Sequence, residues 1–242
     1  MSARFLGVDL GWFGKPTGVA SITWDGSNLR LKQAMRIEDP AALPAWMESE
    51  AGTGSAVVGV DAPLVIRNPK GIRPCEVELN REFRRFHAGC HPANLGRPFA
   101  PYVTAFSHCL ASAGFQHGAE IQARKRARVQ IEVHPHAASI NLFSLDRIVK
   151  YKRGRREDRA RELNRLRGLL LNRLPKLNPP LSLRLPLVPK AGPLKPVEDQ
   201  IDAVLCAYIA AYWWFWARER NTVYGYMDSG YIVVPKSVNL VS

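Results

Sequence analysis

The sequence has few cysteines, no long apolar segment and no excess of acidic residues. Four cysteines in 242 residues predict a reducing, cytoplasmic compartment and argue against a disulfide framework. The longest apolar run, residues 203–217, is shorter than the ~20 residues that a membrane span needs. The N-terminus enters an apolar segment directly, without the h-region of a signal peptide. We therefore expect a protein with no membrane partner.

Several motifs that would identify an enzyme class are missing as well. The sequence contains no Gly-x-x-x-x-Gly-Lys-Ser/Thr phosphate-binding loop and no Gly-x-Ser-x-Gly nucleophile elbow. Cys75, His87, Cys90 and His91 do not have the spacing of a common zinc site, so we interpret them as ordinary core or loop residues. No internal repeat occurs.

The charge balance is strongly positive. The 34 Lys and Arg residues outnumber the 21 Asp and Glu residues, which gives a net charge of +13. A surplus of this size favours nucleic acid as a partner, and a charge that serves only solubility is the alternative. Leucines at helical spacing predict an amphipathic basic helix over residues 155–173. The residues predicted to contact nucleic acid are Lys15, Lys150, Lys152, Arg153, Arg155, Arg156 and Arg159.

The pattern of apolar residues predicts an α/β fold. Residues 4–9, 19–24 and 29–37 are apolar or alternating segments joined by turns, which predicts three antiparallel strands. The later elements are a helix over 40–50, strands over 56–60 and 127–133, a long helix over 198–220 and a hairpin over 224–234. A cap-like helical insertion at about 66–120 and a basic helix with a proline-rich loop at about 147–196 interrupt this order. We predict a single domain over 1–242, with a mixed five-stranded sheet flanked by helices.

Two aspartates end apolar strands. Asp9 follows the first strand and Asp61 follows the fourth. Each is preceded by a glycine two residues back on the same face, which would let a backbone or a ligand come close. A buried carboxylate is costly unless it is paired or bound to a metal. We therefore interpret Asp9 as the centre of a divalent-metal site.

Further acidic residues occur at two other places. Glu132 and His134 leave the fifth strand on the same face, and a structural pair is the alternative to a catalytic one. Asp199 and Asp202 are neighbours on the first turn of the late helix. Asp199 could also serve only to complement the helix dipole.

Together these residues predict Mg²⁺- or Mn²⁺-dependent hydrolysis. Two ions about 4 Å apart activate a water and neutralise the leaving oxygen of a phosphodiester, and Mg²⁺ prefers carboxylate oxygens. Asp9 would bridge the ions, while His134 would orient a water or act as a general acid. The predicted catalytic residues are Asp9, Asp61, Glu132, His134, Asp199 and Asp202. The predicted metal ligands are Asp9, Asp61, Asp199 and Asp202.

The order of the strands and acids resembles the ribonuclease H-like superfamily. There the first strand carries a central aspartate, the fourth strand a second acid and the late helix one or two more. The pair Asp199-x-x-Asp202 looks like the junction-resolvase branch, which uses a glutamate where this chain has Asp61. The resemblance implies a ribonuclease H-like sheet whose first three strands are antiparallel.

A second resemblance covers nearly the whole chain in order. Its motifs are Gly7-Val8-Asp9-Leu10, Gly59 to Leu64, Glu132 to Ala137, Tyr151-Lys152, Asp199 to Ala203 and Gly230 to Pro235. They resemble the family called domain of unknown function number four hundred and twenty-nine. Members of that family are described as predicted ribonuclease H-like nucleases. The resemblance implies a metal-dependent nuclease acting on DNA or RNA.

Two other functions remain open. One is a nucleic-acid-binding protein of the same fold without turnover. The other is an actin-like or kinase-like nucleotide-binding protein, suggested by the glycine-rich turn at residues 11–18. The aromatic run at residues 212–216 could stack on bases. At helical spacing it is more typical of a core or of a homodimer contact.

Overall fold

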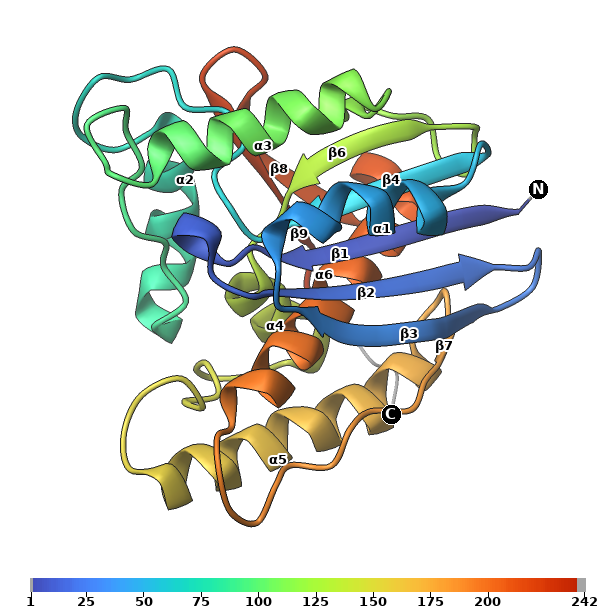
Figure 1. Ribbon diagram of the computed structural model, residues 1–242, viewed down its shortest axis with the longest axis vertical. Coiled ribbons are helices and arrows are strands. Elements are labelled where there is room, and N and C mark those ends of the chain that lie inside the picture. Colours follow the sequence, from blue (N-terminus) through green and yellow to red (C-terminus); the bar gives the residue numbers. More distant parts are fainter. Residues whose placement is uncertain (1, 239–242) are drawn as a thin grey trace.

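A sheet of seven strands forms the centre of the computed structural model, which describes residues 2–238. The strand order is β5-β6-β4-β1-β2-β3-β7 (Figure 1). The bounds are β1 Ala3–Asp9, β2 Thr17–Trp24, β3 Leu29–Ile37, β4 Ser55–Val60, β5 Gln116–His117, β6 Arg128–Glu132 and β7 Leu181–Ser182. The pairs β1–β2 and β2–β3 are antiparallel, and the other four pairs are parallel. β1 therefore lies where the antiparallel part of the sheet meets the parallel part.

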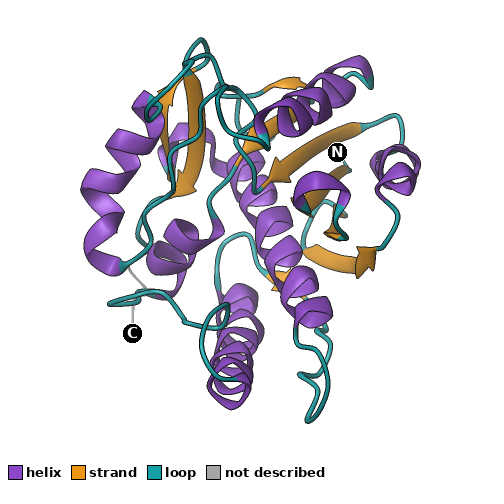
Figure 2. Ribbon diagram, turned by 60° about the vertical axis from the view of Figure 1, so that its left-hand side comes forward, coloured by secondary structure: helices purple, strands orange, loops and turns teal. Residues whose placement is uncertain are grey.

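Helices cover both faces of this sheet, and a separate hairpin lies beside α2 (Figure 2). The helices are α1 Leu43–Ala51, α2 Pro74–Phe83, α3 Ala100–Ser112, α4 Pro135–Phe143, α5 Arg156–Arg173 and α6 Lys195–Trp216. Short 3₁₀ turns span Trp12–Gly14, Pro40–Ala42, Arg84–Phe86, Leu174–Lys176 and Ala217–Glu219. The hairpin consists of β8 (Asn221–Tyr226) and β9 (Gly230–Pro235). Among the residues described, no helix combines the length and the apolar character needed to cross a bilayer.

The structure confirms a mixed sheet with three antiparallel strands at its start, flanking helices and a C-terminal hairpin. The predicted number of five strands is wrong, because the short strands β5 and β7 extend the two edges of the sheet. Two residues carry no recognisable period, so only their neighbours in space identify these strands. Helix α4 was not predicted, because it is buried at eight of its nine positions and so lacks an amphipathic pattern.

Alternate residues of the central strands belong to two different cores. Leu6 and Val8 of β1 pack with residues of α1 and α3, which lie on the near face in Figure 1. Phe5, the residue before Leu6, lies on the opposite face and packs with residues of α6. Gly7 and Asp9 share the α6 face with Phe5, because side chains alternate along a strand. The apolar runs of β1 and β4 are thus explained by burial on both faces.

Three glycines let the backbone of α6 rest directly on the sheet. A Cβ atom on Gly7 of β1 would lie 1.9 Å from the carbonyl oxygen of Ala203. A Cβ on Gly18 of β2 would lie 2.1 Å from the oxygen of Asp199, and one on Gly59 of β4 would lie 2.6 Å from the oxygen of Cys206. This contact confirms the close backbone approach predicted from the glycines before Asp9 and Asp61. It also places the first turns of α6 beside the C-terminal ends of β1 and β4.

We expect Gly7→Ala to lower the free energy of unfolding by about 3 kcal/mol or more, because the added methyl group would push α6 away from β1. Urea denaturation measures the loss. Gly168→Ala is the matched control, since Gly168 lies in α5 with no atom near its Cβ position. That change should raise stability by up to about 1 kcal/mol through helix propensity. A Gly7→Ala protein as stable as the wild type would contradict the contact.

Candidate functional site

Asp9 and Asp61 lie at matching positions on the ends of two neighbouring parallel strands. Val8 of β1 is in register with Val60 of β4, and the amide of Asp61 donates a hydrogen bond to the Val8 carbonyl at 2.9 Å. Parallel strands are about 4.8 Å apart, so the two aspartates leave the sheet side by side. Within residues 2–238 the structure gives neither carboxylate a hydrogen bond or an ion pair, and both are partly exposed. Their oxygens are therefore open to a ligand.

The charges around these aspartates identify the other members of the cluster. Burial raises the pKa of Asp9 well above its ordinary value, and the nearby charge of Asp202 raises it further. Burial likewise raises the pKa of Asp61 to about 6, while Lys152 lowers it and Asp202 raises it. The structure thus brings Asp9, Asp61 and Asp202 together from β1, the end of β4 and α6. Lys152 and, more weakly, Lys195 are the cations that lower the pKa of both Asp9 and Asp61.

Two residues of the loop that precedes α5 bind the carboxylate of Asp202. The Tyr151 hydroxyl donates a hydrogen bond to its Oδ1 at 2.6 Å, and Nζ of Lys152 lies 2.8 Å from its Oδ2. Lys152 was predicted to contact nucleic acid, and the structure places its ammonium group on the acidic cluster. Tyr151 was not among the predicted site residues. The dipeptide Tyr151-Lys152 is among the motifs that carry the resemblance noted from the sequence, and that was the available signal.

Asp199 has a different environment, although it lies one turn away from Asp202. Nε of Arg36 on β3 is 3.1 Å from its Oδ2, and Nζ of Lys195 is 2.5 Å from its Oδ1. Its side chain is 2% exposed. Both oxygens therefore lie against positive charges, and Asp199 joins the start of α6 to β3. This arrangement favours a structural ion pair over a metal ligand.

Glu132 is also engaged by protein groups. Arg73 forms a two-pronged ion pair with it, at 2.6 Å from Nη2 to Oε1 and 2.8 Å from Nη1 to Oε2. The amide of Leu64 donates a third hydrogen bond to Glu132 at 3.0 Å. Arg73 binds Glu76 as well, at 2.8 Å. This buried network joins the end of β6 to the start of α2 and occupies the oxygens that were predicted to act in catalysis.

His134 does not pair with Glu132, although both were expected to share a face. Its Nε2 donates a hydrogen bond to the carbonyl of Ala88 at 3.1 Å, and its ring lies 6.0 Å from that of His136. Burial lowers the pKa of His134 to about 3 and that of His136 to about 4. Both imidazoles are therefore neutral at pH 7. A neutral His134 suits the orientation of a water better than proton donation.

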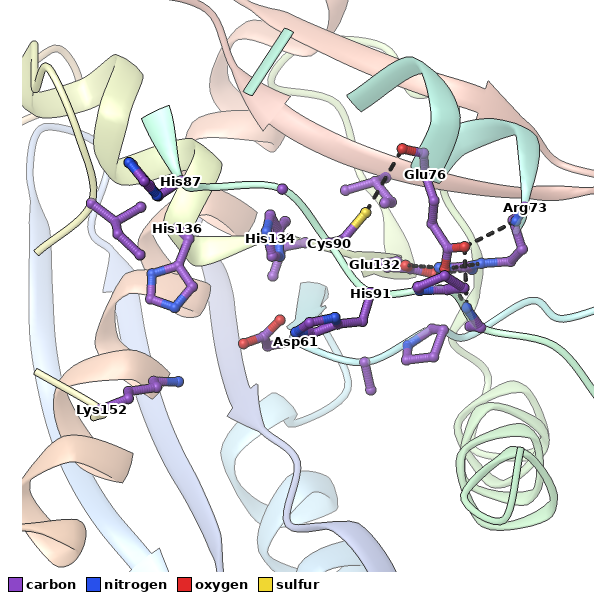
Figure 3. Close-up of a pocket in the computed structure, with 18 of the residues that line it drawn as sticks. Asp61, Arg73, Glu76, His87, Cys90, His91, Glu132, His134, His136 and Lys152 are labelled. Carbon is purple, nitrogen blue, oxygen red and sulfur yellow. Dashed lines mark hydrogen bonds and ion pairs between the residues drawn. The ribbon is translucent and has the colours of Figure 1, made fainter. Parts of the chain in front are cut away.

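A cavity of about 640 Å³ opens beside Asp61 (Figure 3). Its polar lining comes from the ends of β4 and β6, the starts of α2 and α4, residues 87–93 in the predicted insertion and the segment before α5. The polar and charged residues are Asp61, Arg73, Glu76, His87, Cys90, His91, Glu132, His134, His136, Lys150, Lys152 and Arg153. Figure 3 shows Asp61, His136 and Lys152 directed toward the same open space. A ligand in this cavity would contact a carboxylate and several cations.

The basic helix forms as predicted, with Leu163, Leu166 and Leu170 buried. Some of its arginines bind protein groups. Arg156 donates to the carbonyls of Pro189 and Gly192, and Arg159 pairs with Glu198. These contacts hold the proline-rich loop and the start of α6. The exposed members of the predicted set are Lys15, Lys150, Lys152, Arg153 and Arg155.

The open carboxylates of Asp9 and Asp61 suit Mg²⁺. Mg²⁺ keeps several waters and is usually held by one or two carboxylates together with substrate phosphates. Asp9 and Asp61 provide those two carboxylates, while Asp202 is engaged by Lys152. Over residues 2–238, no three His, Cys, Asp or Glu side chains are arranged to hold an ion. The residues therefore fit one hydrated ion on Asp9 and Asp61 better than the predicted set of four ligands.

We expect Asp61→Asn to stabilise the metal-free protein at neutral pH. A carboxyl group whose pKa rises from 3.8 to about 6 on folding contributes stability below its unfolded pKa and loses it as the pH rises through 6. The advantage of Asp61→Asn over the wild type should therefore grow by about 2 kcal/mol between pH 4 and pH 8. Urea denaturation in EDTA measures it. Asp146→Asn, at an exposed loop position, should show no such growth. A difference in free energy of unfolding between Asp61→Asn and the wild type that does not change with pH would contradict a raised pKa of Asp61.

Residues 7–226 match the model of a family described as protein of unknown function (DUF429). The comparisons with curated proteins and with solved structures found no match.

Proposed function

The chain belongs to the DUF429 family, and from that premise we propose that it is a divalent-metal-dependent nuclease that hydrolyses phosphodiester bonds in DNA or RNA. The observation that carries the proposal is the pair of open carboxylates, Asp9 and Asp61, on adjacent strand ends. An acidic pair without protein partners is unfavourable in itself. Such a pair is retained where a cation binds.

The carboxylates and cations around the cavity suit phosphodiester chemistry. Bound Mg²⁺ or Mn²⁺ would activate a water and neutralise charge on the phosphate. Asp9 and Asp61 would hold the ion. Lys152 lies on the wall of the cavity and remains 36% exposed, so its ammonium group can contact a phosphate oxygen while it stays paired with Asp202. His134, neutral and fixed by Ala88, would orient a water.

We also propose that the sheet is ribonuclease H-like. Three features support this: β1 carries Asp9 in the middle of the sheet, Asp61 follows the adjacent β4, and α6 crosses both strands with Asp202 on its second turn. This is the placement of acids that the resemblance implies.

We expect Asp9→Asn to reduce Mn²⁺- or Mg²⁺-dependent cleavage of a labelled oligonucleotide by at least about a hundredfold, because the substitution removes an anionic ligand. Binding of the oligonucleotide in EDTA should be nearly unchanged. Asp146→Asn serves as the control and should cleave normally. Anomalous density from a crystal soaked in Mn²⁺ should lie between residues 9 and 61. Density elsewhere, or cleavage that survives Asp9→Asn, would contradict the proposed site.

The cationic wall of the cavity predicts a salt-dependent affinity for nucleic acid. Replacing Lys150 and Arg153 together by alanine should weaken binding across sequences. The same change should reduce the slope of log K against log salt by about 1 to 2, because two phosphate contacts are lost. Arg161 and Arg165 are the control pair, because each already pairs with an acid on α5. Affinity that does not depend on salt would exclude this contact.

One observation favours a second function, nucleic-acid binding without hydrolysis. Lys152 neutralises Asp202 within the cluster, which reduces the attraction of the site for a second metal ion. In that case wild-type protein would bind oligonucleotides but show no cleavage with any divalent ion. A nucleotide-binding role for residues 11–18 receives less support. The amide of Gly11 donates to Oγ1 of Thr17, so the turn closes on itself.

A further inference from the structure

An exposed aromatic side chain stands on the wall of the cavity. Trp12 lies three residues after Asp9, in the 3₁₀ turn that follows β1. Its ring packs against Phe99, with ring centroids 4.2 Å apart and an interplanar angle of 52°. The residue is still 39% exposed, and it lines the cavity together with Phe99. Phe99 thus fixes the Trp12 ring in place while much of the ring remains exposed.

The size and lining of the cavity indicate the kind of ligand. A volume of about 640 Å³ is typical of a pocket that encloses a small molecule. It is far too small for a double helix. Part of the lining is apolar, from Phe99, Ile148, Val149 and Ile232, and part is cationic, from Lys150, Lys152 and Arg153. An aromatic base attached to a phosphate matches these two parts.

We propose that the cavity takes one unpaired nucleotide of a single-stranded nucleic acid, with its base on Trp12 and its phosphate beside Lys150 and Lys152. The inference rests on the proposed function, because it assumes that nucleic acid is the ligand. Bases stack on aromatic side chains irrespective of sequence. A base inside a duplex is already stacked and would first have to leave the helix, which costs energy. The site should therefore discriminate strongly against duplex.

Binding in EDTA separates this inference from hydrolysis. The probes are a fluorescein-labelled single strand of about twelve nucleotides and the same strand in a blunt duplex, measured by fluorescence anisotropy. The single strand should bind at least about tenfold more tightly than the duplex. Trp12→Ala should weaken binding of the single strand by about 5- to 150-fold, which corresponds to the loss of one stacked base. Trp12→Tyr should retain most of the affinity.

Phe13→Ala is the matched control. Phe13 is the next residue in the same turn and is 57% exposed, but it does not line the cavity. Its replacement should leave the affinity for the single strand unchanged. Equal binding of single strand and duplex would overturn the inference. So would equal effects of Trp12→Ala and Phe13→Ala. Circular dichroism of each variant identifies any loss of folding.

Cleavage assays with Mn²⁺ distinguish the failure of the two proposals. Duplex cut as fast as single strand, with no effect of Trp12→Ala, would remove the inference and leave the hydrolase proposal standing. Tight, Trp12-dependent binding of the single strand without cleavage of any substrate would remove the hydrolase proposal and keep the ligand assignment.

Discussion

The contact between the α6 backbone and three strand glycines is the constraint on which the site depends. Gly7, Gly18 and Gly59 lie on three adjacent strands, and a side chain on any of them would collide with α6. Because the helix lies this close, Asp202 reaches the strand ends that carry Asp9 and Asp61. The strand-end aspartates are partly buried there, and this burial raises the pKa of both. The packing of α6 on the sheet therefore also contributes to the electrostatics of the site.

The acids of this region divide into those held by protein cations and those left open. Glu132 is held by Arg73, Asp199 by Arg36 and Lys195, and Glu198 by Arg159. Apart from Lys195–Asp199, which lies within the first turns of α6, these pairs join segments that are distant in the sequence. Asp9 and Asp61 receive no such partner among the described residues. Buried ion pairs rarely add much net stability, so their contribution here is to set positions, while the open pair supplies the chemistry.

The buried network around Arg73 forms the wall of the cavity that faces Lys152 (Figure 3). Arg73 contacts Glu132 at the end of β6, Glu76 in α2 and the carbonyl of Val65. Glu76 in turn accepts from the amide of Ala93. One guanidinium thus ties the parallel part of the sheet to the segment at residues 64–93. The cavity beside Asp61 keeps its shape through this network.

Local patterns in the sequence determined much of the framework. Apolar runs identified the five longer sheet strands, leucine spacing identified α5, and a glycine two residues before each strand-end aspartate indicated the close approach of a backbone. Those signals lie within a few residues of one another, so periodicity and turn chemistry reveal them. Only the tertiary structure decided that Glu132 and Asp199 are ion-paired, that Lys152 joins the acids and that Trp12 stands in the cavity. It also decided the two-residue strands and the buried helix α4. These outcomes depend on partners far away in the chain, such as Arg73 for Glu132 and Arg36 for Asp199. The sequence identifies each charged residue, but the tertiary structure determines which residue forms an ion pair with it.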